Sequence, residues 1–341
     1  MYRTAVTSGK SRAPTLWCPE GRRLRFLHVS EQGKGYLAEL RETETPVPRA
    51  GEVLVRVAAS GLNRADLSQI EGRYPPPPGE PEILGLEAEG TVVQTGEAVC
   101  ALLAGGGHAE YVAAPVGQVF PAPTRLDPLA RAGVPEAFLT AFLNLVLEAG
   151  VRGGDAVLVH AGASGVGLAA IQVATYFGAR VAATTRSREK LPALARAGAD
   201  LALDSTSEDV VGAIESHWGR NAVRAILDPV GASTLAADLE LLATGGVVLC
   251  LATMSGARAE VNLSLLMKKR ARLVGSALRS RSREDKAAIV RRFREEVLPG
   301  FDDGRLSVTV DSAFPPARAA EAFQRMRENR NTGKIIIDWR A

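Results

Sequence analysis

The pattern of apolar and polar positions changes along the chain and divides it into two parts. Before about residue 130, short apolar runs alternate with turn residues such as Pro46, Pro48 and Gly51, which is typical of a small, mostly β domain. After Pro135, apolar positions recur at helical spacing and predict a connecting helix that ends near Gly150. Strands are expected in the first part at residues 25–29, 37–41, 52–58 and 90–94.

Beyond this connecting helix, apolar strands alternate regularly with helical stretches. The alternation predicts an α/β fold with a doubly wound parallel sheet that carries helices on both faces. Its six strands are expected at residues 156–160, 180–184, 201–204, 223–228, 246–251 and 272–276. A final segment, with helices at 286–297 and 317–328 and strands near 308–310 and 334–339, is expected to return to the first domain.

Length, composition and charge favour a two-domain protein and give no indication of a membrane or nucleic-acid-binding protein. A chain of 341 residues with 46% hydrophobic residues is long enough for two well-packed domains. Its net charge of +3 is too small to indicate nucleic-acid binding by itself, and no apolar run is long enough to cross a bilayer. The three cysteines are far apart and odd in number, which favours a reducing, cytoplasmic location.

The N-terminal residues allow a second location. Residues 1–19 contain basic and hydroxyl residues, with no acid before Glu20, a composition shared with mitochondrial transit segments. Pro14 and the lack of a clear apolar stripe argue against a strong amphipathic helix. A disordered tail is therefore the alternative to targeting.

The most informative segment runs from Ala156 to Gly167, where an apolar strand leads into a turn of small residues that opens a helix. Glycines at 162, 165 and 167 let the backbone turn sharply, and the unpaired N–H groups at the helix start favour phosphate oxygens. We therefore predict that a dinucleotide pyrophosphate binds there, although a tight strand-to-helix connection can also use glycines only for packing. The predicted contacts are Gly162, Ala163, Ser164, Gly165, Val166 and Gly167.

The end of the next strand indicates which dinucleotide is bound. An acidic residue there would bind the ribose hydroxyls of NAD, and none is present. Arg186, Ser187 and Lys190 instead form a cationic, donor-rich corner that suits the 2′-phosphate of NADPH. A solvated basic helix start is the alternative, but cations are unfavourable at that end of a helix.

Several short motifs, taken in order, carry a resemblance to a known family. The chain resembles the zinc-independent quinone oxidoreductases of the medium-chain dehydrogenase/reductase superfamily, and within them the p53-inducible quinone oxidoreductase group. The similarity covers residues 24–341, except that the stretch between Gly96 and Cys100 is about ten residues shorter than the family pattern. The motifs are Gly61-Leu62-Asn63-Arg64-Ala65-Asp66, Tyr74-Pro75, Leu84-Gly85-Leu86-Glu87, the glycine turn, Leu278-Arg279-Ser280-Arg281 and Asn331-Thr332-Gly333-Lys334-Ile335.

The resemblance implies a domain organisation and an oligomeric state. It implies a GroES-like catalytic domain, a Rossmann domain that binds NADPH, and a homodimer joined through the cofactor domains. The predicted boundaries are an N-terminal extension at 1–22, the GroES-like domain at 23–142, the Rossmann domain at 143–282 and a C-terminal return to the catalytic domain at 283–341.

Zinc chemistry is the main alternative within this superfamily. Its alcohol dehydrogenases place a cysteine where this chain has Asn63 and a histidine where it has Leu86, and leucine has no lone pair to offer a metal. The four-cysteine structural zinc lobe is also missing. We therefore expect no metal, and an acceptor that is easily reduced, such as a quinone or a conjugated carbonyl compound.

The resemblance also implies roles for individual residues. Asn63 and Thr140 would lie beside the nicotinamide, Tyr74 would line the substrate pocket or donate to the substrate, and Asp66 would orient neighbouring groups. From the sequence alone, Tyr74 could instead pack against the proline run and Asp66 could only start a helix. Asn63, Tyr74 and Asp66 are the predicted catalytic residues, and Leu251, Leu278 and Asn331 complete the predicted cofactor contacts.

Two other functions fit parts of the sequence. Reduction of alkenals or enoyl thioesters would keep the cofactor but would need a larger pocket and a positioned proton donor. The basic residues concentrated between 268 and 294 could form an RNA-binding face, yet no array of stacking aromatics accompanies them. Acidic residues interspersed at 284, 285, 295 and 296 favour a solvated surface that flanks a dimer interface.

Overall fold

The computed structural model describes residues 23–341, so the predicted extension at 1–22 and its targeting alternative lie outside the described residues. The chain forms a parallel six-stranded sheet in the order β10-β9-β8-β11-β12-β13. This order, with the switch point between β8 and β11, is that of a dinucleotide-binding fold and confirms the predicted doubly wound sheet. The strands are β8 (Ala156–Val159), β9 (Arg180–Thr185), β10 (Leu201–Asp204), β11 (Val223–Asp228), β12 (Leu242–Cys250) and β13 (Arg272–Gly275).

Alternate residues of these strands pack on opposite faces of the sheet. Val157 and Val159 of β8 face a core shared with α3 and α4, whereas Leu158 packs with Ile214 of α6 and Leu239 of α7. Since both faces are covered, the central strands are apolar throughout. The helices around this sheet are α4 (Gly165–Tyr176), α5 (Leu191–Arg196), α6 (Val210–Trp218), α7 (Leu235–Leu241) and α8 (Leu263–Lys269).

The second lobe is built on a seven-stranded sheet that contains both early and late segments of the chain. Strand β15 pairs antiparallel with β3, which joins the C-terminal segment to the first part of the chain. The sheet contains β3 (Glu52–Leu62), β4 (Glu87–Val92), β5 (Ala98–Leu102), β6 (Tyr111–Pro115), β7 (Val119–Pro121), β14 (Val310–Phe314) and β15 (Lys334–Asp338), and a separate hairpin is formed by β1 (Arg23–Gln32) and β2 (Gly35–Glu44).

Strands β5, β6 and β7 were not predicted. They are short and rich in alanine and valine, so their apolar pattern is weak. The shortened segment before Cys100 closes as a tight hairpin, in which Gly96 N donates to Val92 O at 2.8 Å and Val92 N donates to Glu97 O at 2.9 Å. The chain is therefore shorter than the family pattern only in the loop between β4 and β5, and the pairing of these two strands is intact.

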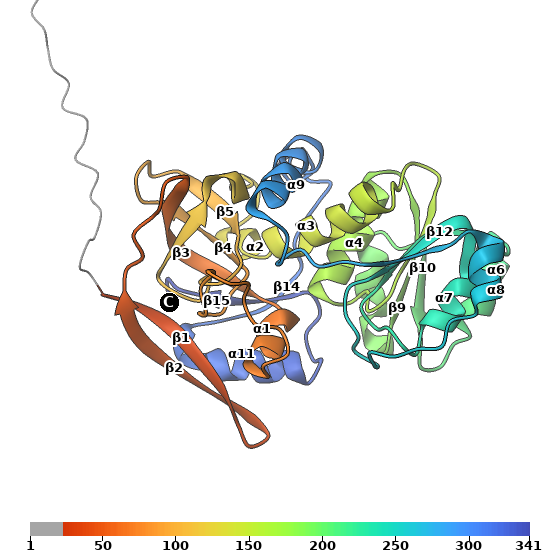
Figure 1. Cartoon of the computed structure of the whole chain (residues 1–341), viewed down its shortest axis with the longest axis horizontal. Coiled ribbons are helices and arrows are strands. Elements are labelled where there is room, and N and C mark those ends of the chain that lie inside the picture. The colour runs from red at the N-terminus through yellow and green to blue at the C-terminus, as the bar shows by residue number, and fades with distance from the viewer. Residues whose placement is uncertain (1–22) are drawn as a thin grey trace, which may run out of the picture.

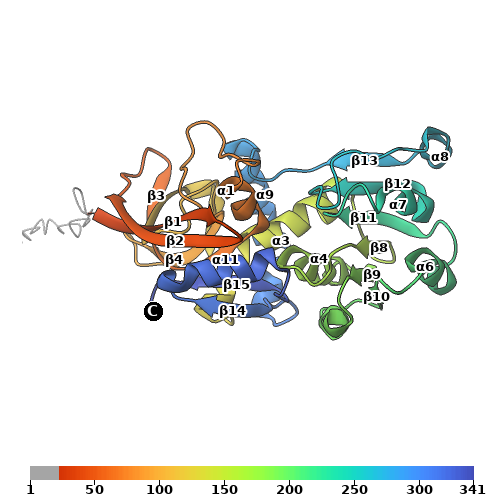
Figure 2. The same ribbon diagram turned by 90° about the horizontal axis from the view of Figure 1, so that it is seen from below.

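The chain passes from one lobe to the other through a long helical segment and returns through residues 276–282, between β13 and α9 (Figures 1 and 2). Helix α3 (Pro135–Phe142) continues without a break into a π-helical stretch, Leu143–Glu148. A domain boundary at residue 142 would thus fall inside a continuous helix, and the predicted division of the chain remains a prediction. The remaining helices lie with the second lobe and its junction with the first: α1 (Arg64–Ile70), α2 (Pro128–Arg131), α9 (Arg283–Glu296), α10 (Pro299–Asp302) and α11 (Ala319–Arg327).

Helices in residues 23–341 are too short or too polar to span a lipid bilayer.

Strand β4 carries a buried acid, Glu89, that is 4% exposed. Its Oε2 atom has no hydrogen-bond partner among the described residues, and Arg131 Nη1 lies 3.8 Å from Oε1. Burial raises the pKa of Glu89 to about 7, and the attraction of Arg131 and Arg340 only partly opposes this shift. The folded protein therefore keeps a proton on Glu89 at pH values where an unfolded chain has lost it.

We predict that Glu89→Gln removes a pH-dependent loss of stability. Because the folded-state pKa of about 7 exceeds the ordinary value of 4.5, wild-type stability falls as pH rises through 7. The free energy of unfolding of the variant should gain about 1–3 kcal/mol relative to wild type between pH 5 and pH 8. Urea denaturation at each pH measures it, and parallel pH profiles for the two proteins would contradict the assignment.

Candidate functional site

The glycine-rich turn between β8 and α4 has the geometry of a phosphate cradle. Gly162 N donates to Thr184 O at 2.7 Å, which fixes the turn to β9. A Cβ atom on Gly167 would overlap the backbone of Ala161 and Gly162, so only glycine allows the helix to approach so closely. Ser164 Oγ accepts from Gly167 N at 3.0 Å and caps α4. The N–H groups of Gly165 and Val166 lie in the first helical turn, where the helix itself provides no acceptor for them, so they are available to a ligand.

This donor set fits a pyrophosphate, and the turn contains all six residues predicted to contact it, 162–167. The C-terminal segment of the chain closes one side of the turn. Gly333 N donates to Ala163 O at 2.9 Å, and Ser164 and Gly333 form a short parallel bridge. The second lobe thus reaches the phosphate cradle directly.

The predicted phosphate corner is only partly free. Arg186 is exposed and makes no hydrogen bond within residues 23–341. Ser187 Oγ donates to Glu189 Oε1 at 2.9 Å, while Lys190 Nζ donates to the carbonyl oxygens of Asn329 at 2.6 Å and Asn331 at 2.8 Å. Two residues that were each predicted to contact the cofactor, Lys190 and Asn331, are therefore in contact with each other, and two hydrogen bonds of the Lys190 ammonium group serve the chain itself.

A further cation joins this corner from the other lobe. Arg64 lies close enough to Arg186 for the two like charges to repel each other. Burial is the main cause of the lowered pKa of Arg64, and repulsion by Arg186 adds to it. Its guanidinium donates to Met326 O at 3.1 Å and to the side chain of Asn329. The corner consequently holds like charges together across the two lobes, an arrangement that an anion would stabilise. The sequence did not indicate that Arg64 belongs to this corner, because Arg64 is far from Arg186 along the chain.

A buried polar cluster lies at the other end of the site. Lys334 Nζ donates to Glu87 Oε1 at 2.5 Å, to Asn63 Oδ1 at 2.8 Å and to Leu62 O at 3.1 Å. Asn63 Nδ2 donates to the same Glu87 oxygen at 3.0 Å. Lys334 is 4% exposed and Glu87 is fully buried, so the two charges form a buried ion pair with Asn63 bonded to both.

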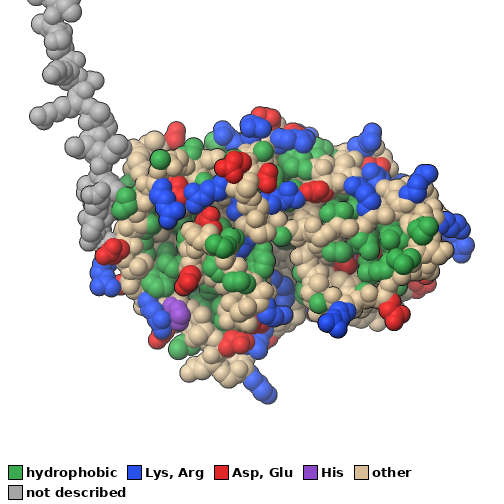
Figure 3. Space-filling model, viewed as in Figure 1, with side chains coloured by type: hydrophobic (Ala, Val, Ile, Leu, Met, Phe, Trp, Pro, Cys, Tyr) green, Lys and Arg blue, Asp and Glu red, His purple; other side chains and the backbone are tan. Residues whose placement is uncertain are grey.

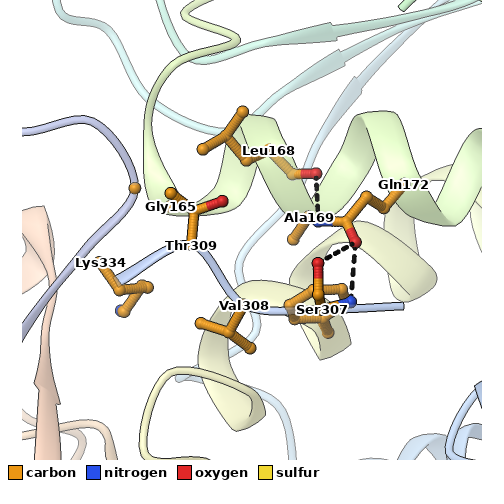
Figure 4. A pocket seen from close by; sticks show the side chains of 10 residues that line it. Gly165, Leu168, Ala169, Gln172, Ser307, Val308, Thr309 and Lys334 are labelled. Atoms are coloured by element: carbon orange, nitrogen blue, oxygen red, sulfur yellow. Dashed lines mark hydrogen bonds between the residues drawn. The ribbon is translucent and has the colours of Figure 1, made fainter. Parts of the chain in front are cut away.

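Two glycines make room for this cluster. A Cβ atom on Gly61 would overlap the Glu87 carboxylate, and one on Gly165 would overlap the Lys334 side chain. Figure 4 shows Lys334 and Gly165 around a small cavity that is also lined by Leu168, Ala169 and Gln172 of α4 and by residues 307–309. Lys334 therefore lies between the phosphate cradle and Asn63.

The carboxylate of Asp66 is occupied by backbone groups. Its Oδ2 accepts from Asn63 N at 2.8 Å and its Oδ1 accepts from Gly85 N at 3.0 Å. Asp66 is 1% exposed, so it holds the start of α1 and the Asn63 backbone in place. This geometry matches the helix-start alternative and favours a positioning role over contact with substrate.

One face of α3 presents polar groups beside this cluster. Glu136 and Thr140, one helical turn apart, are partly exposed, whereas Ala137, Leu139 and Ala141 are buried. Glu136 N donates to Glu87 Oε2 at 2.8 Å, but Glu136 Oε2 is shielded from solvent and has no hydrogen-bond partner among the described residues. Burial raises the pKa of Glu136 to about 8, the Glu87 carboxylate adds to the shift, and Lys334 opposes it.

Tyr74 lies near this face of α3. The guanidinium carbon of Arg279 is 5.3 Å from the centre of the Tyr74 ring, and Arg279 Nη1 donates to Tyr74 O at 3.1 Å. Burial raises the pKa of Tyr74, and Glu136 contributes to the increase. The phenol is accordingly protonated at neutral pH and is held by Arg279.

The remaining predicted contacts differ in their placement. Leu251 follows β12, and its N–H donates to Asp228 O at 2.9 Å, which places it at the carboxyl edge of the parallel sheet. Asn331 Nδ2 donates to Gly333 O at 2.8 Å beside the glycine turn. Leu278 is 5% exposed and packs in the large core cluster. Leu251 and Asn331 therefore border the site, while the side chain of Leu278 supports it from the core.

The two positions where zinc-dependent relatives were expected to carry a cysteine and a histidine offer no metal ligand in the described structure. Leu86 is 1% exposed and apolar, and the amide of Asn63 is bonded to Glu87 and Lys334. Among residues 23–341, no three His, Cys, Asp or Glu side chains are grouped so as to hold a metal ion.

Sequence reasoning did not assign Glu87, Lys334 and Glu136 to the site. Glu87 and Lys334 belong to motifs that carry the family resemblance, but the motifs indicate no role for them. Nothing in the sequence around Glu136 distinguishes it from other helical acids. The available signal was a single lysine at the start of the apolar run 334–337 and an acid preceding the apolar residues of α3.

Comparisons with known proteins agree with this geometry. Residues 49–124 match the family described as the alcohol dehydrogenase GroES-like domain, and residues 165–295 match the family described as zinc-binding dehydrogenase. Human quinone oxidoreductase is 27% identical over 326 residues, which cover 92% of this chain and 97% of the relative. A phenolphthiocerol/phthiocerol polyketide synthase of Mycobacterium tuberculosis is 28% identical over 320 residues, covering 91% of this chain and 14% of that protein.

A solved structure extends these comparisons. The quinone oxidoreductase of Thermus thermophilus, whose structure was also determined in complex with NADPH, is 32% identical to this chain and has a TM-score of 0.78. The alignment covers 92% of this chain and 99% of the Thermus chain.

Proposed function

The chain belongs to the medium-chain dehydrogenase/reductase superfamily, and we propose that it is an NADPH-dependent, zinc-independent reductase of quinones. Oxidoreduction with a nicotinamide cofactor follows from its quinone oxidoreductase relatives and from the Rossmann sheet. The observation that supports the finer proposal is the grouping of a glycine turn suited to phosphate, a cationic corner and a buried polar cluster, with no metal-binding set among residues 23–341. By its sequence motifs, the chain resembles the p53-inducible group within the quinone oxidoreductases.

Preference for NADPH is supported by the cationic corner. Arg186 has no partner within the described residues and lies near Arg64 and Lys190. A 2′-phosphate would accept hydrogen bonds from Arg186 and would relieve the repulsion between these charges. No acidic side chain occupies the end of β9, where the ribose hydroxyls of NADH would need an acceptor.

In the proposed reaction, the residues of the chain bind, orient and exclude water. When bound, NADPH supplies a hydride from its dihydronicotinamide ring. Residues 162–167 hold the pyrophosphate through backbone N–H groups, and Asn63 and Thr140 border the nicotinamide end. Asp66 and Lys334 fix Asn63 from two sides, and Tyr74 closes the substrate pocket with its protonated phenol available as a donor.

Reduction of an alkenal or an enoyl thioester is the second candidate function. The similarity to one segment of a polyketide synthase favours it, because thioester-bound acyl chains are the intermediates of such enzymes. The cofactor and the hydride donor would be the same, so the acceptor distinguishes the two functions.

We predict that the purified protein oxidises NADPH only when an acceptor is supplied, and fastest with ortho- or para-quinones. Initial rates should be measured with quinones, alkenals and enoyl thioesters, with NADH and a metal chelator as controls. Higher kcat/KM with an enoyl thioester than with any quinone would favour the second function. Loss of activity upon chelation would overturn the metal-free proposal.

We predict that Arg186→Ala weakens NADPH binding by about 10- to 100-fold, because the charge-assisted hydrogen bonds to the 2′-phosphate are lost. NADH has no 2′-phosphate, so its binding should be almost unchanged. Lys190 is left intact because it holds the C-terminal segment. Arg196→Ala, an exposed arginine in the last turn of α5, is the matched control. Fluorescence titration of both cofactors gives the affinities, and equal losses for NADPH and NADH would refute the role of Arg186.

A homodimer through the cofactor-binding lobes is part of the proposal. Strand β13 is the edge strand of the six-stranded sheet, and Figure 2 shows it with α8 along one outer margin of the lobe. Leu263, Met267 and Leu273 are 65%, 76% and 37% exposed there. An unpaired edge with exposed apolar side chains is suited to pairing with a second copy.

We predict that Met267→Lys combined with Leu273→Lys converts a dimer into a monomer without unfolding the lobe, because both side chains are on the surface. Light scattering after size-exclusion chromatography measures the mass, and circular dichroism checks the fold. A wild-type protein that is already monomeric at all concentrations would exclude the dimer.

Nucleic acid is not a proposed partner. Arginines of the basic stretch are paired with acids: Arg281 with Glu148, Arg283 with Glu52 and Glu80, and Arg292 with Glu296. Figure 3 shows acidic side chains among the Lys and Arg side chains of the visible face. We propose a cytoplasmic location, since Cys100 and Cys250 are both free thiols, as is usual in a reducing compartment.

A further inference from the structure

Glu136 is an acid in the site that forms no ion pair with any residue in 23–341. Lys334, the cation that most opposes the raised pKa of Glu136, is bonded to Glu87, whose carboxylate also accepts from Asn63 and from the backbone of Glu136. Glu136 therefore contributes its N–H to the cluster, while its Oε2 atom stays buried without a partner among the described residues. A buried carboxyl oxygen of this kind is more stable in the neutral, protonated form.

Six charged or titratable groups lie near enough to Glu136 to interact with its charge. Glu87 on β4 and Asp66 on α1 disfavour its ionisation, while Lys334 on β15 and Lys286 on α9 favour it. Tyr74 and Arg279 are also near enough for the Glu136 charge to affect them. The balance leaves a proton on Glu136 at neutral pH, since its pKa is raised to about 8.

Glu136 lies beside the residues that we propose to border the acceptor. It shares a face of α3 with Thr140, one turn away, and it is near enough to Tyr74 for its charge to contribute to the raised pKa of the phenol. Asn63 is separated from Glu136 only by the Glu87 carboxylate, whose two oxygens bind Asn63 Nδ2 and Glu136 N. The acid therefore stands next to the groups that border the nicotinamide end of the site.

We infer that Glu136 is a catalytic residue that donates the proton accompanying hydride transfer to the acceptor; this inference rests on the proposed function. The acceptor gains a hydride with its electron pair from the C4–H bond of NADPH and a proton from the Glu136 carboxyl group. NADPH is oxidised to NADP⁺, the acceptor is reduced by two electrons, and Glu136 is left as a carboxylate. Solvent returns its proton after product release.

The expected effect of Glu136→Gln is a decrease in kcat of about 100-fold, within the usual range for loss of a general acid. Wild-type kcat should fall as pH rises through about 8, because the acid must be protonated, and the variant should lack this decrease. Glu136→Asp, which keeps the carboxyl group, should restore part of the rate. Affinity for NADPH, measured by fluorescence titration, should change by less than about threefold in both variants, a difference below 1 kcal/mol.

Two further variants test whether the effect is specific to Glu136: a control at another buried acid, and a variant of the alternative proton donor. Glu89→Gln also removes a buried acid of raised pKa, but Glu89 lies outside the site, so kcat should stay at the wild-type value. Tyr74→Phe removes the alternative donor, whose pKa is raised above its ordinary value of 10.0. If Tyr74→Phe abolishes the decrease in kcat near pH 8 while Glu136→Gln preserves it, the inference is overturned.

A readout independent of turnover completes the experiment. Glu89 also keeps a proton up to about pH 7, so infrared spectra are taken of the cofactor-free Glu89→Gln variant. They should show a protonated carboxyl band that disappears as pH rises through about 8, and this band should be absent when Glu136→Gln is added. Absence of the band from Glu89→Gln alone would overturn the inference. A wild-type enzyme inactive toward every acceptor would overturn the proposed function, whereas an active wild type with an equally active Glu136→Gln variant would overturn only the role of Glu136.

Discussion

The ion pair between Lys334 and Glu87 is the interaction on which the arrangement of the site depends. Lys334 begins the last strand of the chain, Glu87 begins β4, and Asn63 follows β3, so one pair of charges ties three strands of the seven-stranded sheet together. Burying both charges is costly unless every polar atom finds a partner. Three acceptors for the lysine and three donors for the carboxylate meet this condition.

The same pair also connects the two lobes. The aliphatic part of Lys334 fills the space that the missing side chain of Gly165 leaves at the start of α4. The neighbouring Gly333 pairs with Ala163 in the phosphate cradle. The glycine turn that we propose as the pyrophosphate site and the strand that follows Gly333 and bonds Asn63 are thus in direct contact. Displacement of either lobe would therefore disturb both ends of the proposed cofactor site.

The sequence was sufficient for features that depend on local pattern. Regular alternation of apolar strands and helices predicted the doubly wound sheet, because buried parallel strands are apolar on both faces, as Val157 and Leu158 are. It was insufficient for β5, β6 and β7, where short runs of small residues pair with strands that are distant in sequence. Pairing of that kind is set by tertiary contacts and leaves little periodicity to detect.

The candidate site shows the same division. The glycine turn could be recognised because its residues are contiguous in the sequence and follow an apolar strand directly. Glu87, Glu136 and Lys334 are separated by 49 residues or more, and each is an ordinary charged residue until the fold brings them together. Lys190 illustrates the reverse case: its position suggested a free cation, but the structure assigns its ammonium group to two carbonyl oxygens of the C-terminal segment. Which partner a long side chain finds depends on the fold.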